Sequence, residues 1–203
     1  ESVLTVGRTR SPSSHPKLRQ LIHTDFFDYS GIADELSGHD ACFFCLGVSS
    51  AGMGEAEYTR LTYELTMATA GALTALNPRS TFCYVSGEGA DRTGQGRFMW
   101  ARVKGRTENA LLDLPFNAYM FRPGFIQPLK GVRSRTPIYR VVYAVLAPLY
   151  PLLSRLFARH VTTTVNVGRA MIRVARSGYG SRILENSDIN GVAAAARRDS
   201  SSA

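Results

Sequence analysis

Short, unbroken runs of apolar residues alternate with helix-length segments through the first 125 residues of the chain. Continuous runs of β-branched and aromatic residues, rather than alternating ones, are typical of strands buried on both faces of a parallel sheet. Five such runs are predicted to be strands: 2–6, 20–23, 41–46, 81–86 and 118–121.

Three segments between these runs have helical patterns, at about 30–37, 55–76 and 97–113. The longest has apolar residues at three- and four-residue spacing and stops at Asn77 and Pro78, which terminate helices well. Strands that alternate with helices of this length predict a doubly wound, parallel α/β sheet with right-handed crossovers. The chain has 203 residues, enough for one domain with a full hydrophobic core.

The pattern changes after Arg122, where five prolines between 123 and 151 interrupt a basic, apolar segment of loops and short helices. A later helix is expected to start behind 162–164 and to end near Gly178, followed by a short last strand at 183–184. We therefore expect four regions: an α/β core over 1–124, a lid or substrate segment over 125–160, a returning helix and strand over 161–192, and a disordered tail over 193–203.

The formal net charge of +8 is unevenly spread. No Asp or Glu occurs from Leu114 to Leu184, a stretch that carries eleven basic residues. Such a field attracts anions, among them dinucleotide phosphates, anionic substrates, acidic lipid headgroups and nucleic acid. We do not expect nucleic acid as a partner, because no recognised binding module is present and the arginines are interleaved with long aliphatic runs.

The sequence shows no signal peptide and no apolar run long enough to span a membrane, so a cytoplasmic location is expected. The apolar, aromatic and arginine-flanked segment 139–157 allows three interpretations. It suits a lid over an apolar substrate, a helix lying peripherally on an anionic membrane surface, or packing against the main sheet or a second subunit of an oligomer.

No metal site is expected from the cysteines or histidines. Cys42 and Cys45 lie three apart on a predicted strand, so their side chains point to opposite faces and are interpreted as core. The four histidines show no ligand spacing, and no carboxylate pair accompanies them.

The candidate chemistry gathers where the predicted strands end, which is where ligands bind in open parallel sheets. Arg8 is placed to bind the 2′-phosphate of NADP, with Arg10 assisting, although it also suits a solvated loop. Lys104 shares a helix face with residue 100 and would meet Ser86, although a surface lysine is the plainer interpretation. The strand-end candidates are Gly7 and Arg8; Cys45, Leu46 and Gly47; Ser86; and Arg122, Pro123 and Gly124.

These stretches resemble the extended and atypical short-chain dehydrogenase/reductases, in particular the Tat-interacting oxidoreductase-like and nucleoside-diphosphate-sugar epimerase-like branches. The resemblance implies a Rossmann fold, NADP rather than NAD as cofactor, and a Ser/Tyr/Lys catalytic group that includes Ser86 and Lys104. It also places Asp25 and Phe26 at the cofactor. The matching stretches are 6–8, 39–47, 84–87, 103–108 and 121–124.

The chain departs from the family pattern in two ways. The family's first strand and its Gly-x-x-Gly-x-x-Gly turn would precede Glu1, so we interpret the chain as a fragment that binds cofactor poorly. Trp100 occupies the position of the catalytic tyrosine, and an indole N–H does not titrate usefully. Tyr84 and Tyr58 are candidate substitutes.

A peripheral membrane protein that uses residues 139–157 and the surrounding arginines is one open function, and two others remain. The first is an NADP-dependent oxidoreductase or epimerase-like enzyme that acts on an unidentified carbonyl, alcohol or sugar-nucleotide-like substrate. The second is a non-catalytic dinucleotide-binding regulator, which the tryptophan at position 100 favours.

Overall fold

The computed structural model describes residues 2–128 and 159–201. Residues 139–157, for which the sequence leaves three roles open, therefore lie outside the described residues, as does most of the expected lid or substrate segment 125–160. In order along the chain, the elements are β1 (Val3–Gly7), β2 (Leu18–Ile22), α1 (Ala33–Leu36), β3 (Ala41–Phe44), α2 (Glu55–Thr59), α3 (Leu65–Leu76), β4 (Thr81–Val85), α4 (Met99–Leu112), β5 (Asn117–Arg122), β6 (Phe125–Gln127), β7 (Val161–Thr163), α7 (Thr164–Ser177), β8 (Ile183–Glu185) and α8 (Asn186–Ser201).

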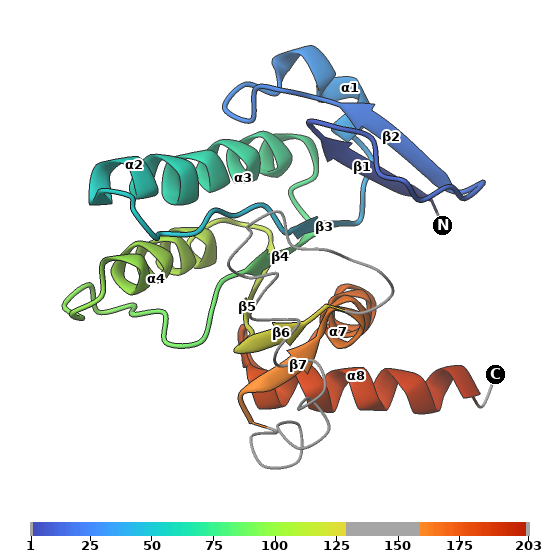
Figure 1. Cartoon of the computed structure of the whole chain (residues 1–203). Helices are drawn as coiled ribbons and strands as arrows, with labels where there is room; N and C mark the ends of the chain where they lie inside the picture. The colour runs from blue at the N-terminus through green and yellow to red at the C-terminus, as the bar shows by residue number, and fades with distance from the viewer. Residues whose placement is uncertain (1, 129–158, 202–203) are drawn as a thin grey trace.

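Within residues 2–128 and 159–201 all strand pairs are parallel, as the sequence predicts, and they form three groups. The main sheet has the order β3-β4-β5-β8, while β1 pairs with β2 and β6 pairs with β7. Figure 1 shows β1 and β2 above the main sheet, with α3 and α4 on one side and α7 and α8 below. The arrangement is the predicted Rossmann-like α/β fold.

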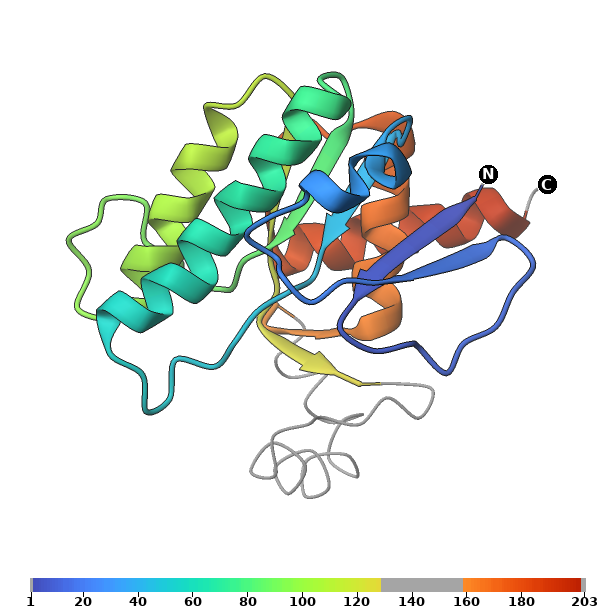
Figure 2. The ribbon, with the colours of Figure 1, turned by 90° about the horizontal axis from the view of Figure 1, so that it is seen from above.

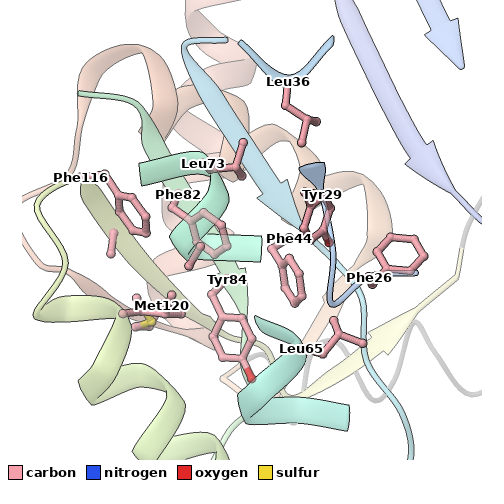
Figure 3. Close-up of a cluster of buried hydrophobic side chains, with 13 residues drawn as sticks. Phe26, Tyr29, Leu36, Phe44, Leu65, Leu73, Phe82, Tyr84, Phe116 and Met120 are labelled. Atoms are coloured by element: carbon pink, nitrogen blue, oxygen red, sulfur yellow. The ribbon is translucent and has the colours of Figure 1, made fainter. Parts of the chain in front are cut away.

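Two-sided burial explains why β4 and β5 are continuously apolar. Phe82 and Tyr84 join a cluster with the helices α3 and α4, whereas the intervening Cys83 packs on the opposite face against α7 and α8. In β5 the same alternation sends Met120 to the first cluster and Phe121 to the second. Figure 3 shows the aromatic side chains of the first cluster filling the space between the sheet and α3. Each strand is therefore covered on both faces, as a parallel sheet requires.

The predicted helices are present, with two differences. The helix over 55–76 is continuous but contains a π-helical turn at Arg60–Glu64 between α2 and α3. The prediction of a disordered tail from residue 193 was wrong for the described part, because α8 continues to Ser201. Alanines at 193–196 are the strongest helix formers, and Val192 and Ala193 are buried in the second cluster.

The helix α7 begins and ends as its sequence predicts. The hydroxyl oxygen of Thr163 accepts a hydrogen bond from the backbone N–H of Asn166 and caps the first turn. Gly178 follows the last residue at a φ of 67°, a left-handed conformation that favours glycine.

Gly105 holds α4 close to the loop that follows β4. A Cβ at this buried position would overlap the backbone carbonyl of Asp91, so the helix approaches the loop only because residue 105 has no side chain. The backbone N–H of Asp91 also donates to the carbonyl of Ala101 on α4. This close approach fixes the helix that carries Lys104.

We expect Gly105→Ala to lower the free energy of unfolding by about 1–3 kcal/mol, because overpacking outweighs the gain in helix propensity. Gly168→Ala on α7 is the matched control, since nothing lies within 4 Å of its Cβ position. The control should raise stability by about 0.5–1 kcal/mol. Urea denaturation of both variants measures the difference, and equal effects would contradict the close packing.

Candidate functional site

Ser86 and Lys104 meet at the carboxyl end of β4. The Lys104 ammonium donates a hydrogen bond to the backbone carbonyl of Ser86, with an Nζ–O distance of 2.6 Å. The Ser86 side chain is 5% exposed, and its hydroxyl oxygen has no hydrogen-bond partner among the described residues. A buried polar atom without a partner is costly, so this hydroxyl is available to a ligand.

Burial shapes the chemistry of Lys104. Desolvation lowers the pKa of Lys104 to about 8, and the nearby Glu108 carboxylate opposes this shift. Lys104 and Glu108 are four residues apart on α4 and so share a helix face. The amine therefore changes its charge close to neutral pH, where it can give or take a proton.

Trp100 lies one helical turn before Lys104, and its indole ring borders the loop after β4. A Cβ at Gly89 would lie 3.6 Å from the indole Cη2. The candidate substitutes for a catalytic tyrosine are both interior, because Tyr58 and Tyr84 are at most 2% exposed. Burial raises the pKa of each phenol, which disfavours proton donation from either.

The guanidinium of Arg122 is held by two carboxylates. It donates to Glu108 through Nε at 2.9 Å and Nη2 at 2.5 Å, and to Glu185 through Nη1 at 2.9 Å. Glu108 is fully buried, whereas Glu185 is 47% exposed. Hydrogen bonds to Glu108 raise the pKa of Arg122. Because Arg122 lies on β5 and pairs with Glu108 of α4 and Glu185 of β8, its side chain links these three elements.

Pro123 and Gly124 are closely packed behind Arg122. The backbone N–H of Glu88 donates to the Pro123 carbonyl, and the N–H of Gly124 donates to the side-chain oxygen of Asn186. A Cβ at Gly124 would overlap the backbone carbonyl of His160, whose ring pairs with the Glu88 carboxylate. The turn therefore contacts both the loop after β4, through Glu88, and the residue before β7, His160.

The candidates at β1 form a second group. The guanidinium of Arg8 lies over the ring of Phe26, 5.8 Å from its centroid. Asp25 uses its carboxylate to accept the backbone N–H of Phe27. Gly7 and Arg10 line a depression of about 250 Å³ beside β1 and β2. Arg8 is exposed at the strand end, where an anionic group can reach it.

The candidates that follow β3, Cys45, Leu46 and Gly47, are exposed. Cys45 and Leu46 line the same large cavity as Phe26, with a volume of about 960 Å³. Among the described residues, contacts link Arg8 to Phe26 and Lys104 to Ser86, but none joins these two pairs. The structure thus gathers the candidates at the strand ends in two groups.

Sequence reasoning missed the buried carboxylate of Glu108, which pairs with Arg122 and lies one helical turn from Lys104. The spacing of Lys104 and Glu108 was a usable signal, since residues four apart on a helix are neighbours. It also missed the pairing of His160 with Glu88, which are 72 positions apart.

Within residues 2–128 and 159–201, no cluster of three or more His, Cys, Asp or Glu side chains could hold a metal ion. None of the helices in this part of the chain is long and apolar enough to cross a membrane.

No protein-family model matches the sequence, and no curated protein matches it significantly. Solved structures do match in fold. The chain aligns with RMD from Pseudomonas aeruginosa complexed with NADPH at a TM-score of 0.54 and 15% identity, over 84% of this chain and 70% of that one. It aligns with DesIV, a dTDP-glucose 4,6-dehydratase from Streptomyces venezuelae with NAD and TYD bound, at a TM-score of 0.56 and 15% identity.

That alignment covers 88% of this chain but only 63% of the dehydratase. The Bordetella bronchiseptica enzyme WbmF in complex with NAD+ aligns at a TM-score of 0.60 and 13% identity, over 94% of this chain and 68% of WbmF. The chain is therefore structurally similar to NAD(P)-dependent epimerases and dehydratases, and the similarity shows a Rossmann-like fold.

The two carboxylates around Arg122 predict unequal effects of substitution. Glu108→Gln should lower the free energy of unfolding by about 3 kcal/mol or more, because it leaves Arg122 partly buried beside a neutral group. Glu185→Gln is the matched control and should cost less than about 1 kcal/mol, because water screens its exposed carboxylate. Chemical denaturation at pH 7 measures both, and equal losses would show that Glu108 does not anchor Arg122.

Proposed function

We propose that the protein is an NADP(H)-binding member of the reductase and epimerase class, with its reaction site at Ser86 and Lys104. The observation that carries this proposal is the Ser86 hydroxyl, which is buried and unpartnered at a strand end beside the Lys104 amine. In a Rossmann-like sheet, ligands bind beyond the carboxyl ends of the strands. The solved structures of similar fold contain NADPH, or NAD with a nucleotide, which supports a dinucleotide at this edge.

The residues fit the nicotinamide end of such a cofactor better than its pyrophosphate. Ser86 offers a hydroxyl and Lys104 an amine, both suited to ribose hydroxyls and a substrate carbonyl. The pyrophosphate of a dinucleotide usually binds at a glycine-rich turn and a helix N-terminus. When bound, the dinucleotide would supply the hydride.

Residues of the protein would supply the hydrogen bond, the orientation and the proton that the reaction also needs. The Ser86 hydroxyl would donate a hydrogen bond to the carbonyl oxygen of the substrate and so stabilise developing negative charge. The indole of Trp100 cannot transfer a proton, so Trp100 would act only by contact, orienting the nicotinamide ring or the substrate. The proton would come from Lys104, whose pKa of about 8 suits a general acid near neutral pH.

Arg8 would select the phosphorylated cofactor. It is exposed at the end of β1, where its guanidinium could bind a 2′-phosphate while resting on Phe26. The substrate is a carbonyl, an alcohol or a sugar-nucleotide-like compound. A non-catalytic dinucleotide-binding regulator is the second candidate, and the indole at position 100 favours it.

Cofactor preference tests the dinucleotide assignment. We expect NADPH to bind more tightly than NADH, and Arg8→Ala to weaken NADPH roughly tenfold while leaving NADH unchanged, because one charge-assisted contact is lost. Arg19→Ala on the exposed side of β2 is the control and should change neither. Ligand-observed NMR titrations at pH 6.5 measure these affinities. Equal binding of the two cofactors by the native chain would contradict the role of Arg8.

Turnover separates the enzyme from the regulator. We expect the native protein to oxidise NADPH slowly with a panel of aldehydes and ketones, and Trp100→Tyr to accelerate the reaction by roughly 10²-fold or more by restoring a proton donor. Trp100→Phe is the control, because it keeps an aromatic ring without a titrating group. If neither the native chain nor Trp100→Tyr shows turnover while NADPH binds, the regulator is the correct function.

A further inference from the structure

The rings of Phe98 and Trp100 form an aromatic ledge at the start of α4. Their centroids are 6.5 Å apart and their planes differ by 27°, which is a stacked arrangement. Phe98 is 61% exposed, whereas Trp100 is partly buried. Figure 2 shows the loop between β4 and α4, drawn in green, at the left edge of the molecule beside the first turn of α4. One ring of the pair is therefore open to a ligand.

The aromatic ledge adjoins the candidate reaction site. Trp100 and Lys104 are four residues apart on α4 and so share a helix face. A Cβ at Gly87 would lie 3.8 Å from the Lys104 Nζ, and a Cβ at Gly89 would lie 3.6 Å from the Trp100 indole. Ser86 directly precedes Gly87, and its buried hydroxyl has no partner among the described residues. The hydroxyl, the amine and the indole therefore border the same short loop.

Hydrogen bonds hold the backbone of Phe98 while its ring stays exposed. The Phe98 carbonyl accepts the backbone N–H groups of Ala101 and Arg102 in the first turn of α4. The Arg102 guanidinium donates to the Gly96 carbonyl and to the Glu55 carboxylate. Ligand sites typically combine fixed apolar and aromatic walls with a few well-placed polar groups, and the aromatic ledge beside Ser86 has this composition.

The carboxylates of the surrounding loop are already bonded to protein groups. Glu88 pairs with His160. The Asp91 carboxylate accepts hydrogen bonds from Thr93 and from the backbone N–H of Gly96. A sugar ring on the aromatic ledge would thus place its hydroxyls against aromatic rings, where burying them without partners is costly. A flat aromatic ring avoids this cost.

We propose that the aromatic ledge makes this site specific for aryl ketones and aldehydes, an inference that rests on the proposed function. The carbonyl oxygen would accept a hydrogen bond from the Ser86 hydroxyl, while the attached aryl ring stacks on Trp100 and Phe98. Stacked rings prefer centroid distances of about 4.5–7 Å. The carbonyl carbon would accept the hydride that the dinucleotide supplies, and the oxygen would accept a proton from Lys104, which leaves an aryl alcohol and NADP⁺.

A pair of matched ketones tests the proposal. Acetophenone and cyclohexyl methyl ketone carry the same acetyl group, on an aromatic ring and on a saturated ring of the same size. Without dinucleotide, we expect acetophenone to bind roughly three- to tenfold more tightly, because only its ring gains stacking. Ligand-observed NMR titrations measure both affinities. With NADPH present, kcat/KM should favour acetophenone by a similar factor.

Fluorescence locates the bound ketone. Trp100 is the only tryptophan in the chain, so its emission reports on the aromatic ledge itself. Acetophenone should quench this emission with the same saturation midpoint that NMR gives. Quenching that does not saturate where NMR shows binding would place the ketone elsewhere and overturn the proposal.

Variants of Phe98 supply the matched controls. Phe98→Ala should remove the preference for acetophenone and change the affinity for cyclohexyl methyl ketone by less than about twofold, because only ring stacking is lost. Phe98→Tyr keeps the ring and should retain the preference. Tyr179→Ala removes a ring that is 38% exposed before β8, at the opposite end of the parallel sheet, and should change neither affinity. A ¹⁵N correlation spectrum of each variant checks its fold.

Three further results would overturn the proposal: equal binding of the two ketones by the native chain, a preference that survives in Phe98→Ala, and displacement of acetophenone by a lower concentration of UDP-glucose. The last would assign the aromatic ledge to a sugar nucleotide. Binding of NADPH without a preference for acetophenone would overturn the ledge alone. The preference without NADPH binding would keep the ledge as an aryl ketone site and contradict the dinucleotide assignment.

Discussion

Burial of β4 and β5 on both faces is the constraint on which the rest of the structure depends. Because alternate side chains enter two separate apolar clusters, both strands are held between α3 and α4 on one side and α7 and α8 on the other. Their parallel register brings the ends of β4 and β5 to the same edge, where Val85 pairs with Phe121. Ser86 and Arg122 emerge there, and the candidate chemistry follows from that position.

One chain of charged groups then couples the core to this edge. Arg122 binds the buried Glu108, Glu108 faces Lys104 along α4, and Lys104 bonds to the backbone of Ser86. Partial burial makes the Lys104 amine easier to deprotonate, while Glu108 limits this effect. These ion pairs stabilise the fold, and the network ends at a strand terminus where the buried Ser86 hydroxyl lacks a partner among the described residues.

The sequence predicted the elements well because their patterns depend on local burial. The runs at 81–86 and 118–121 are strands since both faces are covered, and Gly178 ends a helix since it adopts a left-handed conformation. The helical tail was missed because its low-complexity sequence does not reveal that Val192 and Ala193 are buried in the second cluster. Contacts distant in sequence could not be predicted, such as the bond between Arg122 and Glu185, which are 63 positions apart.

The central claim is that the edge formed by Ser86 and Lys104 faces a dinucleotide. A crystal structure of the chain with NADPH tests it most directly. The account predicts the nicotinamide ribose or ring within hydrogen-bonding distance of the Ser86 hydroxyl and the Lys104 amine, with the 2′-phosphate near Arg8. NADPH bound elsewhere, with the Ser86 hydroxyl satisfied by a protein group, would contradict it.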